Sequence, residues 1–113
     1  MSSSPSPAQP ARLVSNLLAE EPDLRDLVEN FVNGLDDRLS RLRSACEKLD
    51  WQQLVLLTHQ LKGAAGSYGY PQLSELAATM EQAVRARTAD QLSDWLRQLE
   101  QLVAAAHAGL QPE

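Results

Sequence analysis

The sequence has one cysteine, Cys46, and its aromatic residues amount to only 4% of the chain. A single cysteine cannot form a disulfide within the chain and cannot build a cysteine-based zinc site. With so few aromatic rings, any hydrophobic core has to consist mainly of leucine and alanine. Cys46 lies among apolar residues at helical spacing, so we expect a buried free thiol.

The chain also lacks an excess of positive charge and any long apolar run. Its formal net charge is -5, which argues against nucleic acid and against anionic membrane surfaces as partners. No run approaches the roughly 20 apolar residues of a membrane span, and no charged segment followed by an apolar one begins the sequence. We therefore expect a cytoplasmic protein without membrane contact.

Strand-like alternation of apolar and polar residues is absent as well. Residues 1–10, MSSSPSPAQP, are rich in serine and proline without periodicity, which predicts a disordered tail. A flexible linker to another domain has the same composition. Residues 11–110 have the length and apolar content of one folded domain.

Apolar residues recur at spacings of three and four along the rest of the chain, which predicts helices. A capping box at Asp50 and Gln53 marks one helix start, and Thr88 with Gln91 marks another. We interpret Gly34 as a close-packing point or a tolerated weakness, not as a break. The expected helices span 11–19 (short), 22–49, 50–69, 71–84 and 88–109. Short connections favour an all-α fold, an antiparallel up-down-up-down four-helix bundle with a short N-terminal capping helix.

The stretch THQLKGAAGSYGY, residues 58–70, places glycines in a helix, where each costs about 1 kcal/mol relative to alanine. On a helical wheel the apolar residues of this helix cluster on one side. His59, Lys62, Gly63 and Gly66 share the outward face. Glycine there exposes backbone and lowers the helix profile beside the imidazole. A neutral imidazole nitrogen is a nucleophile, and Lys62 can balance an anion that the ring carries.

HQLKGAAGSYG, residues 59–69, resembles the His-x-x-Lys-Gly-x-x-x-x-x-Gly signature of histidine phosphotransfer (HPt) domains. These are the phosphoryl carriers of two-component phosphorelays, and the resemblance extends from about residue 11 onward. It implies that His59 is phosphorylated on Nε2, that Lys62 neutralises the phosphoryl charge and that Gly63 keeps the approach clear.

The resemblance also implies supporting residues around the phosphorylation site. Gly69 closes the helix, and Ser67 makes local hydrogen bonds. The family often has a glutamine on the following helix that reaches towards the histidine, and spacing puts Glu81 nearest to that position, with Gln82 adjacent. A charged Glu81 facing His59 stabilises imidazolium but repels a phosphoryl group. The full supporting set is Gln60, Gly66, Ser67, Gly69, Glu81 and Gln82.

The chain has no evident carboxylate cluster for Mg²⁺ near the motif and no glycine-rich nucleotide loop. The resemblance implies that the partner receiver domain supplies Mg²⁺, so we expect no cofactor and no metal site here. The chain is then a phosphoryl carrier without autokinase activity. Its implied partners are receiver domains of response regulators or of a hybrid histidine kinase. Val55 and Leu56, which flank His59 on the wheel, are the candidate docking residues, with N-terminal leucines and Val14 beside them.

Two other interpretations compete with the carrier. One is a helical interaction or adaptor module that keeps the bundle but has lost phosphotransfer. The other is the dimerisation hairpin of a histidine kinase, which typically has an acidic residue directly after its histidine, whereas His59 is followed by Gln60. That hairpin needs a second copy to complete four helices, while this chain has its own, so we expect a monomer. We expect a structural or exposed role for His107.

Overall fold

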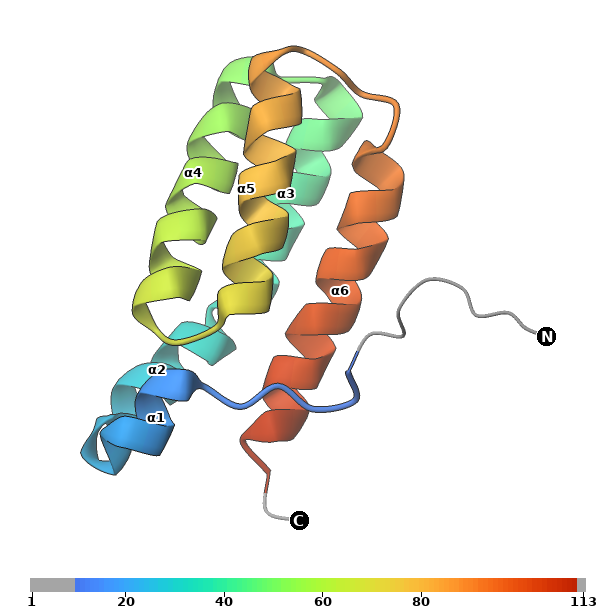
Figure 1. Cartoon of the computed structure of the whole chain (residues 1–113). Coiled ribbons are helices and arrows are strands. Elements are labelled where there is room, and N and C mark those ends of the chain that lie inside the picture. Colours follow the sequence, from blue (N-terminus) through green and yellow to red (C-terminus); the bar gives the residue numbers. More distant parts are fainter. Residues whose placement is uncertain (1–9, 112–113) are drawn as a thin grey trace, which may run out of the picture.

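The computed structural model describes residues 10–111, so the tail predicted over 1–10 lies, apart from Pro10, outside the described residues. Every regular element within this range is helical, as expected (Figure 1). The elements are α1 (Asn16–Glu20), a 3₁₀ turn (Pro22–Leu24), α2 (Arg25–Asn33), α3 (Leu35–Lys48), α4 (Trp51–Ser67), α5 (Pro71–Arg85) and α6 (Leu92–Gly109). No helix within 10–111 is long and apolar enough to cross a bilayer.

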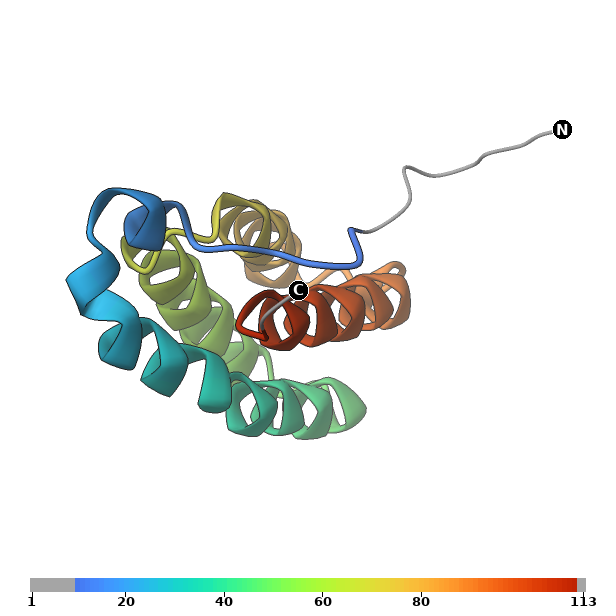
Figure 2. The ribbon, with the colours of Figure 1, turned by 90° about the horizontal axis from the view of Figure 1, so that it is seen from below.

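The four helices α3, α4, α5 and α6 enclose the hydrophobic core. Contacts join α3 to α4, α4 to α5, α5 to α6 and α6 back to α3, and the view along the helices shows this closed arrangement (Figure 2). Leucine, alanine and valine dominate the buried side chains, as the low aromatic content predicts. The aromatic exceptions gather at one end, where Phe31 stacks on Tyr68 at 4.9 Å and on Tyr70 at 5.9 Å between ring centroids.

The helix predicted over 22–49 is interrupted at Gly34, and this prediction was wrong. The Gly34 N–H is shared between the carbonyls of Asn30 and Phe31, both at 3.1 Å, and α2 and α3 run in different directions on either side of it (Figures 1 and 2). A Cβ at Gly34 would meet no atom closer than 3.5 Å, so close packing does not explain the glycine. Instead, its weak helix preference lets the chain change direction there.

The start of the last helix also differs from the prediction. Asp50 caps α4 through a 3.2 Å bond from the Gln53 N–H to its Oδ1. The expected capping box at Thr88 is absent, however, and α6 begins at Leu92 without a side-chain cap. The reason is that the Thr88 N–H is bonded to the Ala83 carbonyl at 2.9 Å, so this residue still belongs to the turn that ends α5.

An N-terminal strap, residues 10–20, crosses the end of the helical ring (Figures 1 and 2). Its helix α1 is shorter than the predicted 11–19 because the preceding residues are extended and bonded to other elements. The Leu13 N–H donates to the Ala105 carbonyl at 2.9 Å, and the Asn16 N–H donates to the Gly69 carbonyl at 2.8 Å. The buried Ser15 hydroxyl donates to the Tyr68 carbonyl at 2.6 Å. The strap therefore closes one end of the core.

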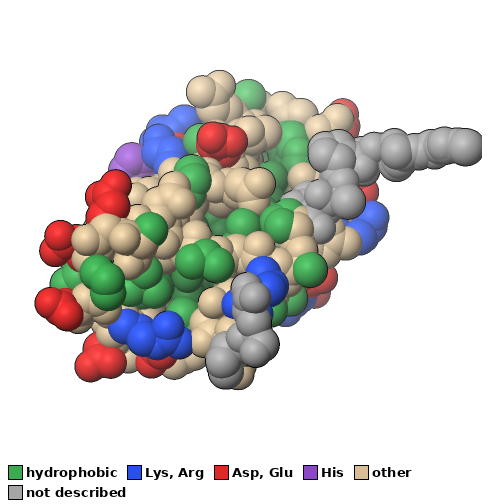
Figure 3. Space-filling view, turned by 60° about the horizontal axis from the view of Figure 1, so that its bottom comes forward, with side chains coloured by type: hydrophobic (Ala, Val, Ile, Leu, Met, Phe, Trp, Pro, Cys, Tyr) green, Lys and Arg blue, Asp and Glu red, His purple; other side chains and the backbone are tan. Residues whose placement is uncertain are grey.

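Hydrophobic side chains remain visible between acidic and basic ones at this end of the molecule (Figure 3). Val14 is 58% exposed, and Leu27 is 50% exposed although it lies on the apolar side of the helix predicted over 22–49. Cys46 was predicted to be buried, but it is only partly buried, at the edge of the core. Burial, with a smaller contribution from the charge of Glu47, raises the pKa of its thiol.

Candidate functional site

Helix α4 presents His59 outward because its opposite side is fixed in the core. Leu54, Leu61 and Ala65 are buried on that inner side. The side chain of His59 is 59% exposed, so a partner can reach the ring. The helix stays intact through the motif because the inward residues hold it against its neighbours.

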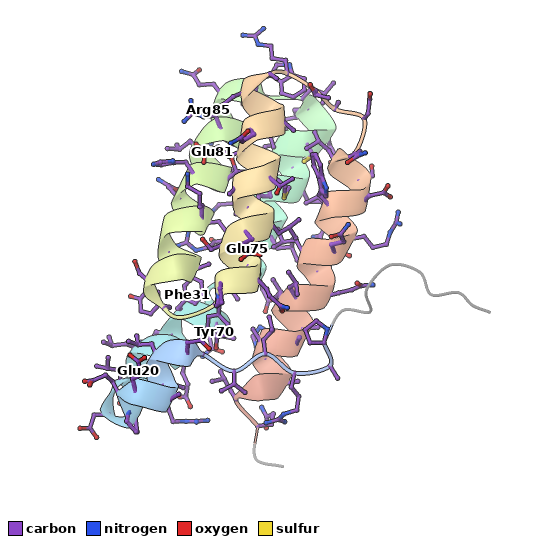
Figure 4. All side chains as sticks on the ribbon, in the orientation of Figure 1. Glu20, Phe31, Tyr70, Glu75, Glu81 and Arg85 are labelled. Carbon is purple, nitrogen blue, oxygen red and sulfur yellow. The ribbon has the colours of Figure 1, made fainter. Side chains whose placement is uncertain are left out.

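Helix α5 contributes Glu81, whose carboxylate is the centre of a polar cluster. Its side chain is only 7% exposed, yet three donors reach it. Lys62 Nζ lies 3.0 Å from Oε1, and His59 Nδ1 lies 3.1 Å from Oε2. Arg85, one turn further along α5, places Nη2 at 2.8 Å and Nε at 3.0 Å from Oε2. Figure 4 shows Glu81 and Arg85 one turn apart on α5, close to α4.

These contacts keep Glu81 ionised despite its burial. The hydrogen bond from Lys62 does most to lower the carboxyl pKa, and bonds from Arg85 and His59 add to it. Burial acts in the opposite direction, because it penalises the charged form. The balance lowers the pKa of Glu81 from 4.5 to about 2. Near neutral pH the cluster therefore contains a carboxylate.

An ionised carboxylate determines which imidazole nitrogen carries the proton. A carboxylate can only accept hydrogen bonds, so the Nδ1 atom that contacts Glu81 must be the donor. In the neutral ring, the other nitrogen, Nε2, then holds the free lone pair. Because the side chain is largely exposed, this nucleophilic atom is available to a group brought by a partner.

Comparison with protein-family models matches residues 26–109 to the Hpt domain. The chain belongs to the Hpt domain family. Domains of this family serve histidine phosphotransfer in phosphorelays. Comparisons with curated proteins and with solved structures gave no match. The matched range of this Hpt domain includes α3 to α6 and all but the first residue of α2, and it leaves out the N-terminal strap.

Sequence reasoning missed Arg85 in this Hpt domain. The signal was present, because Glu81 and Arg85 are four residues apart on a predicted helix and such pairs face each other. Glu81 does face His59, and its negative charge is matched by Lys62 and Arg85.

The three glycines of the motif have different surroundings. Gly63 is exposed, and a Cβ there would have no atom within 4 Å. Gly66 is exposed, as expected for the outward face, and borders α5: a Cβ would be 3.4 Å from Ser74 Oγ, which itself donates to the Lys62 carbonyl at 2.9 Å. Gly69 has φ +86° and ends α4, where positive φ favours glycine.

The other predicted residues lie around the Glu81 cluster without joining it. Gln60 and Ser67 are exposed on α4, and the structure gives Ser67 no side-chain hydrogen bond within 10–111. Gln82 lines a shallow hollow beside Lys62 and Arg85 but is not among the partners of His59.

The two docking candidates have different environments. Leu56 is 48% exposed, whereas Val55 is partly buried against the core. Val55 also lines a second hollow, between α4 and the end of α5, together with Trp51 and Arg87. On α6, His107 is partly buried, with Nε2 3.3 Å from Asp36 Oδ2, which fits its expected structural role. Within residues 10–111, no three His, Cys, Asp or Glu side chains are grouped so as to hold a metal ion.

Proposed function

We propose that this Hpt domain carries a phosphoryl group on His59, accepted from an aspartate of a receiver domain or from a kinase and passed to an aspartate of a response regulator. The observation that supports this most is the environment of the ring. His59 is exposed, and its Nδ1 is held by Glu81, which leaves Nε2 free as the nucleophile. The Hpt family match supports the reaction class.

The transfer step requires no proton movement within this chain. The Nε2 lone pair forms a bond to phosphorus while the bond between phosphorus and the acyl oxygen of the donor breaks, and its electron pair stays on the donor carboxylate. The Nδ1 proton remains on the ring, which becomes positive, and the Glu81 carboxylate stabilises this charge. The reverse sequence delivers the phosphoryl group to the next aspartate.

Lys62 is the proposed partner of the phosphoryl oxygens because its ammonium group lies on the same side of α4 as His59, one turn further on. Mg²⁺ is expected to come with the receiver domain and to polarise the group that is transferred. We propose that this chain contributes no nucleotide site and no autokinase activity. It is a carrier between two enzymes or regulators.

We further propose that the receiver docks over the outward face of α4 near Val55 and Leu56, where Gly63 leaves the approach open. The finer fold proposal is an antiparallel up-down-up-down four-helix bundle with α1 as its capping helix. The ring of α3 to α6 is completed within one chain, which supports a monomer. The proposed location is the cytoplasm.

The experiment is phosphoryl transfer from a radiolabelled, phosphorylated receiver domain of the source organism to the purified chain. Wild-type protein should acquire an acid-labile, alkali-stable label, as expected for phosphohistidine, and His59→Gln should acquire none. His107→Gln is the matched control, because it removes the second histidine of the chain and should still be labelled.

Label on His59→Gln would contradict the assignment of the phosphorylated residue. If no receiver of the source organism labels the wild type, the carrier proposal fails. Equal binding of a receiver by wild type and His59→Gln, without any phosphohistidine, would then favour the adaptor module.

A further inference from the structure

The carboxylate of Glu81 divides its three partners unequally between its two oxygen atoms. Lys62 alone contacts Oε1, at 3.0 Å. Arg85 donates two hydrogen bonds to Oε2, from Nη2 at 2.8 Å and from Nε at 3.0 Å, and His59 shares that oxygen. Arg85 and His59 therefore hold Glu81 in place without any contribution from Oε1.

The charges of the cluster show why a second cation matters. With a neutral imidazole, the carboxylate and the two basic side chains leave one net positive charge. A phosphoryl group on His59 brings about two negative charges to the same place. If Lys62 were the only cation, its charge would already be matched by Glu81. Turning Lys62 towards the phosphoryl group would then leave an uncompensated carboxylate beside that group.

We propose that Arg85 is a positioning residue that keeps Glu81 oriented and neutralised when His59 is phosphorylated, so that Lys62 can leave Oε1 and turn to the phosphoryl group. This inference rests on the proposed carrier function. Lys62 is the mobile member because it makes a single contact through a long flexible side chain. Arg85 is suited to stay, since its guanidinium is always charged and donates two bonds in a fixed geometry.

Phosphotransfer equilibria measured with a cognate phosphorylated receiver test the role of Arg85. Arg85→Gln should lower the equilibrium ratio of phosphorylated to unphosphorylated Hpt domain about ten-fold, the effect of losing a hydrogen bond to a charged group. Arg85→Lys should restore part of it. Arg41→Gln is the matched control, because Arg41 forms a pair with Asp37 at the same four-residue spacing on α3, with N and O atoms 3.0 Å apart. Its equilibrium should equal that of wild type.

A double-mutant cycle separates this role from a merely structural one. If Arg85 acts by releasing Lys62, the substitution Arg85→Gln should change the phosphotransfer equilibrium by less than two-fold when Lys62 is already replaced by glutamine. In the wild-type background the same substitution should keep its ten-fold effect. Independent, multiplying losses would overturn the inference, as would unchanged transfer in Arg85→Gln. Failure of the carrier function has a different signature, namely the absence of label on wild-type protein. Circular dichroism of each variant checks that it is folded.

Discussion

At the scale of single residues, Glu81 combines burial with ionisation, and its titration should therefore be visible in the stability of the domain. Its pKa in the folded chain is about 2, against an ordinary value of 4.5. A depressed folded-state pKa means that the unfolded chain takes up the proton first as the pH falls. The stabilisation from Glu81 is thus fully present above pH 4.5 and is lost as the pH falls from there towards 2.

Glu81→Gln tests this, because glutamine has a similar shape but cannot titrate. The free energy of unfolding should be higher for wild type than for the variant at pH 7, and the difference should shrink on acidification by up to about 1.4 kcal/mol per pH unit. Urea unfolding of both proteins at pH 7, 5, 4 and 3 measures this difference in the free energy of unfolding. A difference that stays constant over this range would show that the carboxylate does not carry the stabilisation.

The same residue shows where prediction from sequence reaches its limit. The motif identifies His59 and Lys62, because the residue types and their spacing lie within one helix. Glu81 is suggested only by spacing on the next helix, and its effect on a phosphoryl group depends on which cations surround it. Those cations come from two helices, Lys62 from α4 and Arg85 from α5. Their convergence depends on how the helices pack, which the local pattern does not specify.

At the scale of the helices, α4 and α5 were predictable, whereas the division between α2 and α3 was not. The signals for these two helices act locally: Asp50 caps the start of α4, Gly69 ends it with a positive φ, and Pro71 begins α5. The apolar periodicity continues through Gly34 without a break, so the sequence pattern favours one long helix. The change of direction there depends on what α2 and α3 each pack against, which is a property of the assembled fold.

Gly63, within α4, and Gly69, just after its end, should respond to substitution in opposite ways. Gly63→Leu should preserve the fold, because a Cβ at this exposed position meets no atom within 4 Å, but should slow phosphotransfer by obstructing the approach to His59. Gly69→Ala should destabilise the domain by about 2 kcal/mol or more, since its φ is +86° and a Cβ would lie 2.6 Å from Ser15 Oγ. Urea unfolding and rapid-quench transfer assays measure the two effects.

Gly63→Ala is the control for side-chain size at the first position. It should stabilise α4 by up to about 1 kcal/mol, because alanine is the better helix former, with a smaller loss of transfer rate than leucine causes. Equal transfer by wild type and Gly63→Leu would argue against Gly63 as a clearance for the partner. An unchanged stability in Gly69→Ala would mean that α4 can end without a positive φ at this position.

At the scale of the whole molecule, the N-terminal strap lies outside the family match but is bonded to the matched domain. It bridges α6 and the turn between α4 and α5 through hydrogen bonds from Leu13, Ser15 and Asn16. At about 1 kcal/mol for each bond, a chain that begins at residue 22 should lose roughly 2–3 kcal/mol of stability. For a domain of this size, that loss should lower the Tm by at least about 8 °C.

Substitution of Gly109 tests whether contacts of the strap with α6 contribute to the stability of the domain, because an added Cβ there would overlap the carbonyl group of Leu13. Gly109→Ala should therefore destabilise the intact chain. In the chain that begins at residue 22 the obstacle is gone, and the same substitution should be neutral or stabilising, since alanine favours the helix. Thermal unfolding of the four proteins measures this reversal of sign. A loss of equal size in both backgrounds would mean that α6 itself requires the glycine, and the strap would then be a peripheral segment and not a part of the core's closure.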